Sequence, residues 1–366
     1  DNTGIKSDFF IPESRTMQCK HHDKVVVEFI EWRAKDKNPI GQITEILGNA
    51  GSNDIEMKSI LIENGFFTAF PKHVLDEADE LKIEIPEEEK KQRRNFSNIA
   101  TFTIDPADAK DFDDALSFKK IEDGMYEIGV HIADVSYYVK EHSAMEKEAF
   151  KRATSVYLVD RVAPMFPERL SNIICSLRPN EDKCCYAAVF KMDDKATIKD
   201  VWFGRTLIHS QKRFTYDEAQ EILEGKDGPF KEELLKLNEL AHILRNNRFK
   251  NGSISFEAPE TKFKLDDNGK PIGVFVKERK DAHKLIEDFM LLANKAVATH
   301  IGKERNQNGK VPFVYRVHDL PDPERLIDFQ LFAQKFGHKV QLNNPKQIAR
   351  ELNRLMIEIE GTPEQT

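Results

Sequence analysis

The chain has 366 residues, with 55 Lys and Arg against 63 Asp and Glu, and a formal net charge of −8. At roughly 150 residues per domain, this length predicts two or three domains, each able to bury a core. Hydrophobic residues make up 40% and charged residues 32%, which excludes a wholly disordered chain. No apolar run approaches the roughly 18 residues of a membrane span. The acidic balance excludes a protein that coats nucleic acid through bulk positive charge.

The first 75 residues have the pattern of short β-strands. Residues 24–32 are rich in β-branched and aromatic side chains, residues 39–48 form a second candidate strand, and Phe9–Pro12 is a third. This spacing predicts a small antiparallel barrel of OB type, a class that often binds single strands through aromatic stacking. A packed β domain without an RNA role of its own is an equal alternative.

Charge density and periodicity divide the rest of the chain. Residues 76–95 are crowded with charge and broken by Pro86, which predicts a solvated connector with a short helix between two domains. Beyond it we expect strands and helices in a mixed order. The predicted strands are 99–104, 115–118, 126–135 and 187–192, and the predicted helices are 215–223, 230–249, 284–301 and 345–359.

The four cysteines are Cys19, Cys175, Cys184 and Cys185. They form neither a Cys-x-x-Cys pair nor a secreted disulfide framework, so we expect reduced thiols and a cytoplasmic protein. Cys19 lies beside two histidines, but no second ligand pair at zinc spacing follows, and a surface thiol is the favoured interpretation.

The most informative segment is an aspartate-rich stretch that follows a predicted strand. Five carboxylates lie within residues 105–114, and such like charges repel one another unless a cation or strong donors compensate them. Hard oxygen ligands suit Mg²⁺, Mn²⁺ or Ca²⁺. An EF-hand is excluded, because Lys110 occupies the glycine position and Leu116 the bidentate glutamate position. The pattern favours a Mg²⁺ cluster for phosphodiester chemistry, with a solvated acidic turn as the alternative.

The spacing of this stretch, IDPADAKDFDDA over residues 104–115, resembles the catalytic motif of the ribonuclease II/ribonuclease R family. Further blocks resemble that family in the same order along the chain, and together they are far more specific than any one of them. They are residues 130–139, 153–158 with 164–171, 251–256, 281–287 and 315–319. The block at 281–287 is closer to the ribonuclease R branch, and the first 75 residues resemble that family's second cold-shock domain.

This resemblance implies an α+β fold class. An OB-like cold-shock β-barrel over residues 1–75 would be followed, after the connector 76–95, by a mixed α/β RNB catalytic domain over 96–366. The implied activity is processive 3′→5′ hydrolysis of single-stranded RNA to nucleoside 5′-monophosphates. The implied cofactor is Mg²⁺, with Mn²⁺ as a substitute. We expect a cytoplasmic monomer with single-stranded RNA as its partner and no membrane.

The resemblance also assigns residues. Asp105, Asp111, Asp113 and Asp114 match the four catalytic aspartates, whereas Asp108 falls outside them. All four are expected at the metal, with Asp105 and Asp114 as the clearest direct ligands. Asp113 matches the position most critical to the chemistry, and we expect it to hold or activate the attacking species.

Four further positions are implied to contact RNA. Tyr157 and Phe256 match an aromatic pair that clamps the 3′-terminal bases, and Tyr216 and Glu287 match positions that select RNA over DNA through the ribose 2′-OH. Without the resemblance, Tyr157 and Phe256 read as ordinary strand aromatics. Glu287 then reads as a helix residue paired with His283 one turn away.

The family's closing Thr-Ser-Pro-Ile-Arg-Arg-Tyr-like block is absent from the sequence, as are the S1 barrel and basic tail of ribonuclease R. We therefore interpret the chain as an incomplete interior fragment, with a truncated catalytic domain and impaired hydrolysis. The alternative function is a non-catalytic module that binds single-stranded RNA. A Ca²⁺-binding structural protein is a weaker third class, because no complete Ca²⁺ loop fits.

Overall fold

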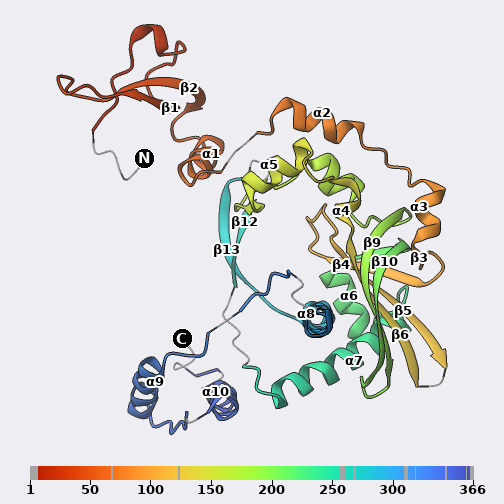
Figure 1. The fold of residues 1–366 in the computed structure, drawn as a ribbon. Coiled ribbons are helices and arrows are strands. Elements are labelled where there is room, and N and C mark those ends of the chain that lie inside the picture. The colour runs from red at the N-terminus through yellow and green to blue at the C-terminus, as the bar shows by residue number, and fades with distance from the viewer. Residues whose placement is uncertain are drawn as a thin grey trace. The chain divides into compact units, whose positions relative to one another are not determined.

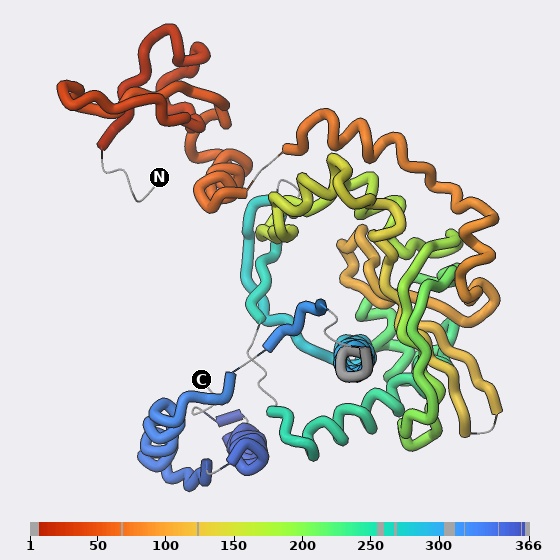
Figure 2. The backbone as a smooth tube through the Cα atoms, viewed as in Figure 1, coloured from red at the N-terminus to blue at the C-terminus, as the bar shows by residue number. Residues whose placement is uncertain are grey.

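The computed structural model describes the chain in two compact units. The described residues are 7–66, 69–122, 124–254, 260–266, 269–308, 312–317, 319–342, 344–359 and 361–362, without the side chains of 304–308. The first unit combines Asp1–Leu81, Tyr138–Ser171 and Thr261–Val276, and the second combines Lys82–Tyr137, Asn172–Glu260 and Lys277–Thr366 (Figure 1). The chain thus enters the first unit three times, as the red-orange, yellow-green and cyan segments of Figure 2 show.

The N-terminal segment of the first unit is built on an antiparallel strand pair, β1 (Asp23–Glu31) and β2 (Ile40–Asn49). Both strands were predicted from their β-branched residues. The third expected strand, Phe9–Pro12, is reduced to a single bridge between Phe10 and Ile40. Pro12 ends it, because proline has no backbone N–H to donate and here precedes a short 3₁₀ turn, Glu13–Arg15.

Helices and two short hairpins complete the first unit. Their bounds are α1 Asn53–Glu63, α2 Lys72–Glu80, α5 Ala144–Arg152, β7 Val156–Tyr157, β8 Val162–Ala163, β12 Glu260–Leu265 and β13 Pro271–Lys277. The carboxylate of Glu77 on α2 accepts hydrogen bonds from the backbone N–H groups of Ala144 and Met145, at 2.7 and 3.2 Å. A carboxylate at the positive end of α5 thereby fastens α5 to α2.

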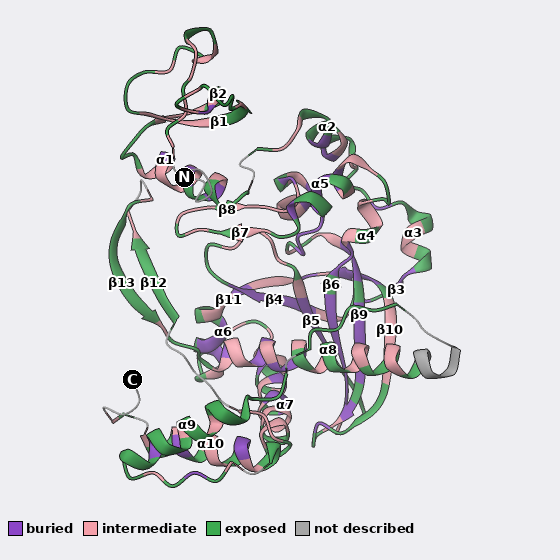
Figure 3. Cartoon of the chain, turned by 60° about the vertical axis from the view of Figure 1, so that its left-hand side comes forward, coloured by how far each residue is buried: buried purple, intermediate pink, exposed green. Residues whose placement is uncertain are grey.

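The second unit contains a seven-stranded mixed sheet in the order β11-β4-β5-β6-β9-β10-β3. The pairs β11–β4 and β10–β3 are parallel, and the other neighbours are antiparallel. The strand bounds are β3 Arg94–Asn95, β4 Ala100–Asp105, β5 Asp114–Glu122, β6 Met125–Ala133, β9 Asp182–Asp193, β10 Ile198–His209 and β11 Lys212–Thr215. Strands β4, β6 and β9 are largely buried (Figure 3).

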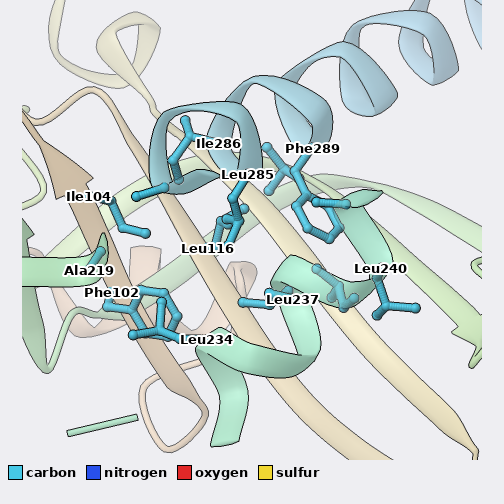
Figure 4. Packing of buried hydrophobic residues seen from close by; sticks show 14 of the residues in the cluster. Phe102, Ile104, Leu116, Ala219, Leu234, Leu237, Leu240, Leu285, Ile286 and Phe289 are labelled. Atoms are coloured by element: carbon cyan, nitrogen blue, oxygen red, sulfur yellow. The ribbon is translucent and has the colours of Figure 1, made fainter. Parts of the chain in front are cut away.

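Three helices, α6 (Tyr216–Leu223), α7 (Lys231–Lys250) and α8 (Asp281–Asn308), pack on this sheet and form the main core. Phe102, Leu116, Leu237 and Phe289 are fully or almost fully buried where strands and helices meet (Figure 4). The remaining helices are α3 Glu87–Gln92, α4 Val135–Tyr138, the π-helical turn Arg169–Ile174, α9 Pro323–Lys335 and α10 Pro345–Ile359. None of the described helices combines the length and apolarity that crossing a membrane requires.

The predicted elements of the second unit are confirmed, with differences at their ends. Strand β9 extends well beyond the predicted 187–192, since its added residues pair with both β6 and β10. Helix α8 begins three residues before the predicted Lys284, because Ala282 already belongs to its buried face. Strands β3, β10 and β11 and helices α4 and α9 of this unit were not predicted, and neither was α5 of the first unit.

A neutral histidine is buried within the sheet. The two ring nitrogens of His131 lie 3.0 Å from Oγ1 of Thr206 and 2.9 Å from Oγ of Ser117. The ring of Phe96 packs edge-on at 4.8 Å. Burial, with a smaller contribution from the charge of Arg94, lowers the pKa of His131 to about 3. His131 therefore stays uncharged in the folded protein between about pH 3 and pH 6.5, a range in which the unfolded chain would protonate it.

This burial predicts acid lability. Because the folded-state pKa lies below the ordinary 6.5, the stability that neutral His131 contributes is complete above pH 6.5 and is lost as the pH falls. The loss should be about 1.4 kcal/mol per pH unit. Urea unfolding at pH 7.5 and pH 5 should show a steeper fall for the native chain than for His131→Gln. Equal falls, or a ring resonance assigned to His131 that titrates between these pH values, would contradict a buried neutral ring.

Candidate active site

The predicted catalytic aspartates lie where three strands end or begin at one edge of the seven-stranded sheet. Asp105 is the last residue of β4, Asp114 is the first residue of β5, and the loop 106–113 joins them. Strand β11 runs parallel to β4 and pairs Thr215 with Asp105. Tyr216 follows at once as the first residue of α6, whose N-terminus is closed by a Thr215–Glu218 capping box. The backbone alone therefore brings Asp105, Asp114 and Tyr216 to the same edge.

The loop itself is anchored by hydrogen bonds to distant segments. The backbone N–H of Phe112 donates to Oγ of Ser176 at 3.0 Å, and that hydroxyl donates to the carbonyl of Lys110 at 2.9 Å. The N–H of Leu177 donates to the carbonyl of Phe112 at 2.8 Å, and the N–H of Ala133 donates to the carbonyl of Asp113 at 3.0 Å. These bonds fix the backbone on which the carboxylates are mounted.

A single arginine on β11 holds the other side of the loop. The guanidinium of Arg213 donates to the carbonyl oxygens of Pro106 and Ala107, the latter at 3.1 Å. It also lies over the ring of Phe112, 5.3 Å from its centroid. Its charge lowers the pKa of Asp105, but burial and the charges of Asp114 and Asp113 together raise that pKa by more. Arg213 thus restrains the loop and supplies positive charge close to the carboxylates.

Asp105 is the most buried of these carboxyl groups, with 7% of the residue exposed. Its Oδ2 atom is buried without a hydrogen-bond partner among the described residues. Burial, reinforced by the charges of Asp114 and Asp113, raises the pKa of Asp105 to about 7. A shift of that size corresponds to about 4 kcal/mol against the ionised form.

The pKa values of the neighbouring aspartates are also raised by desolvation and by nearby negative charge. Burial and the charge of Asp113 raise the pKa of Asp114 to about 6. Partial desolvation within the loop and the charge of Asp111 raise the pKa of Asp113, although its side chain still reaches solvent. The structure therefore brings Asp105, Asp113 and Asp114 together electrostatically, with Asp111 acting through Asp113. Asp108 lies exposed on the loop.

This arrangement fits a hard divalent cation. Carboxylate oxygens are the ligands that Mg²⁺ and Mn²⁺ prefer. The buried Oδ2 atom of Asp105 accepts no hydrogen bond from the described residues, so its lone pairs are available to a cation. A bound cation would remove the repulsion that raises these pKa values. Within the described part of the chain, however, no three His, Cys, Asp or Glu side chains already form a metal-binding group. The carboxylates are thus gathered but are not preset as a complete ligand shell.

Tyr216 lies beside the carboxylates with its ring stacked on His283. The two ring centroids are 4.0 Å apart and the planes are inclined by 10°. Burial, together with the charges of Asp114 and Asp105, raises the pKa of the Tyr216 hydroxyl to about 12. The hydroxyl therefore keeps its proton at neutral pH and is available as a donor.

Glu287 on α8 forms an ion pair with Arg279, which precedes the helix. This contact replaces the pairing with His283 that helical spacing suggests, since the His283 ring is stacked on Tyr216 instead. Tyr157 lies on β7 in the other compact unit, with 67% of the residue exposed. Phe256 lies outside the described residues.

Sequence reasoning missed Arg213, Ser176 and His283. Arg213 lies three residues before Tyr216, but its partners are backbone carbonyls about a hundred residues away, which leave no pattern in a sequence. His283 was noted only as a helical neighbour of Glu287. The one signal that could have found it is its position: His283 is an aromatic residue one helical turn before Glu287, which was predicted to contact RNA.

The repulsion at Asp105 predicts that this carboxylate lowers the free energy of unfolding, although the proposed function needs it. Without divalent cation, Asp105→Asn should raise the free energy of unfolding by about 2–4 kcal/mol at pH 8. Because the folded-state pKa is raised, the ionised carboxylate destabilises the fold increasingly as pH rises from about 4 to 7. The gain should therefore be smaller at pH 5.

Denaturant unfolding of Asp105→Asn and of Asp108→Asn checks this expectation. Asp108→Asn makes the same charge change at an exposed position of the same loop and should leave stability unchanged. A native chain as stable as Asp105→Asn at pH 8 would show that no repulsion is stored at this position.

The chain matches two family models. The RNB domain model matches residues 93–365, and the cold shock domain model matches residues 1–71. "Ribonuclease R 1" of Lactococcus lactis is 36% identical over 367 residues, covering 98% of this chain and 44% of that protein. "Inactive exonuclease DIS3L2" of Arabidopsis thaliana is 32% identical over 348 residues, covering 90% of this chain and 33% of that protein.

A solved structure shares the fold. Mycoplasma genitalium RNase R, in complex with ribose-methylated single-stranded RNA, matches with a TM-score of 0.89 and 26% identity, covering 98% of this chain and 56% of that one. This chain spans less than half the length of the two curated relatives named above. With a cold-shock segment, a mixed α/β unit and an RNB model match over most of its length, the chain belongs to the RNB domain family.

Proposed function

We propose that this protein is a divalent-metal-dependent 3′→5′ exoribonuclease that hydrolyses single-stranded RNA to nucleoside 5′-monophosphates. The observation that carries the proposal is the cluster of repelling carboxylates at the edge of the sheet, of which Asp105 is buried. The Oδ2 atom of Asp105 has no hydrogen-bond partner among the described residues. Desolvation and neighbouring aspartate charges raise the pKa values of Asp105, Asp113 and Asp114. A bound cation would offset this repulsion and favour the ionised carboxylates, which supports a metal-dependent chemistry at this site.

In this proposal Asp105, Asp111, Asp113 and Asp114 hold Mg²⁺, with Mn²⁺ as a substitute. When bound, the cation activates water and stabilises negative charge on the leaving oxygen. The raised pKa of Asp113 suits a carboxylate that orients the attacking water and accepts its proton. Arg213 keeps the loop closed over these side chains through its two carbonyl contacts.

The remaining site residues would grip the RNA. The protonated hydroxyl of Tyr216 can donate to a ribose 2′-OH, while the stacked His283 ring fixes its direction. Glu287 can accept from the same ribose through the carboxylate oxygen that Arg279 leaves free. The exposed ring of Tyr157, with Phe256 as its partner, would stack on bases without reading their identity, at about 1–3 kcal/mol per base.

We also propose a domain organisation, an oligomeric state and a cellular location for this protein. The N-terminal strands would belong to a closed OB-like barrel over residues 1–75, with 76–95 as a connector and 96–366 as the catalytic domain. The paired strands β1 and β2 support the first part, and the helices α2 and α3 lie at the connector. We propose a cytoplasmic monomer whose partner is single-stranded RNA.

Two observations favour a second function, a module that binds single-stranded RNA without cutting it. The described carboxylates form no preset group of three ligands, and one relative in this family is named an inactive exonuclease. The aspartates themselves favour hydrolysis, because a binding module has no need for repelling buried carboxylates.

The test separates binding from hydrolysis. With labelled single-stranded RNA and Mg²⁺, the protein encoded by the full reading frame should shorten the strand stepwise, and residues 1–366 alone should do so more slowly. Asp113→Asn should lower the rate at least ~100-fold and change RNA affinity by less than about threefold, because only the chemical step needs this carboxylate.

Asp108→Asn is the matched control, since it removes one charge from the same loop at an exposed position. It should retain full hydrolysis. A fully active Asp113→Asn would remove this aspartate from the mechanism. A native protein that binds RNA but never cuts it, at any Mg²⁺ or Mn²⁺ concentration, would establish the binding module instead.

A further inference from the structure

Three segments far apart in the sequence meet at one side of the first compact unit. They are the N-terminus of α1, the turn 158–161 of the β7–β8 hairpin, and the turn of the β12–β13 hairpin at Gly269. Figure 3 shows α1 beside both hairpins. Helix α1 follows directly on the β1–β2 pair and lies within the cold-shock match, whereas the two hairpins lie within the RNB match.

Charged and polar side chains join these segments. The guanidinium of Arg161 donates to Asp54 of α1 at 2.5 Å and to its neighbour Asp160 at 2.6 Å. The side-chain amide of Asn53 donates to the same Asp160 carboxylate at 3.2 Å and to the carbonyl of Gly269 at 3.4 Å. The Asp160 side chain is only 6% exposed and Arg161 is 28% exposed, so water screens this network less than a surface ion pair.

The hairpin held in this way carries Tyr157. The hairpin consists of two residue pairs, Val156 with Ala163 and Tyr157 with Val162, and its turn is closed by the N–H of Leu158 donating to the carbonyl of Arg161. A two-stranded hairpin of this length has little stability of its own. The anchored turn four residues from Tyr157 therefore supports this hairpin, together with the hydrogen bond from the N–H of Met165 to Oγ of Ser155 at 2.9 Å.

We propose that Asp54 and Arg161 form a latch through which the cold-shock segment positions Tyr157 for stacking on RNA. The inference rests on the proposed function of Tyr157 and adds two positioning residues that do not themselves touch RNA. It makes the cold-shock segment a determinant of base stacking on Tyr157, in addition to any RNA contact of its own. Because Asp54 is half exposed, the latch should weaken as salt is raised.

The experiment uses residues 1–366 and a fluorescent single-stranded oligouridylate in EDTA, so that binding is measured without hydrolysis. Asp54→Asn should weaken RNA binding about 3- to 10-fold at 50 mM salt. The direction is diagnostic, since removal of a negative charge by itself favours RNA binding. Asp54→Glu, which keeps a carboxylate, should restore most of the affinity.

The matched control is Asp76→Asn, the same charge change at an exposed position of α2 in the same unit. It should leave RNA affinity unchanged or slightly raised. Amide hydrogen exchange gives a second readout that needs no RNA. Residues 156–163 should exchange faster in Asp54→Asn than in the native chain or in Asp76→Asn.

Tyr157→Ala decides whether the latch acts through the ring. Asp54→Asn should have no further effect on RNA affinity in that background. An equal loss in both backgrounds, or unchanged hairpin exchange in Asp54→Asn, would overturn the latch. If Tyr157→Ala weakens binding but Asp54→Asn does not, the latch alone fails. If Tyr157→Ala binds RNA normally, the proposed role of Tyr157 fails and the inference falls with it.

Discussion

Repulsion among closely spaced, partly desolvated carboxylates is the interaction on which the rest of this structure depends. Asp105, Asp113 and Asp114 lie where β4 ends and β5 begins. In addition to desolvation, the charge of Asp113 raises the pKa of Asp105 and of Asp114, and the charge of Asp114 raises the pKa of Asp105. In water such charges would move apart, but the sheet fixes the backbone at both ends of the loop. The fold thus holds the carboxylates close together at a cost in free energy, which the proposed divalent cation would offset.

Several features of the second unit follow from this constraint. The loop is hydrogen-bonded to Ser176 and Leu177 on one side and to Arg213 on the other, which keeps it from opening to relieve the repulsion. Buried core residues of β4, β5 and β11 lie directly behind it, against α6, α7 and α8. Burial, together with the charges of Asp114 and Asp105, raises the pKa of the Tyr216 hydroxyl further above neutral pH. The strands and helices that form the hydrophobic core therefore also position the polar residues at this edge of the sheet.

The aspartate loop could be predicted from the sequence because all of its signal is local. Five carboxylates within ten residues, after a strand, already require compensation, and the order of further motifs identifies the family. Arg213 could not be predicted, because it acts on backbone carbonyls of a remote loop. The β7–β8 hairpin was missed because two residue pairs are too short for any periodicity. Helical spacing suggested that Glu287 pairs with His283, but Glu287 forms its ion pair with Arg279. The His283 ring stacks on Tyr216 instead, a tertiary contact that helical spacing does not reveal.

The central claim is that these carboxylates exist to bind a hard divalent cation. It is tested most directly by anomalous diffraction from crystals of the protein grown at pH 8 and equilibrated with Mn²⁺. The account predicts an anomalous peak in contact with the carboxylates of Asp105 and Asp114. Crystals saturated with Mn²⁺ that show no peak at this edge of the sheet would contradict it.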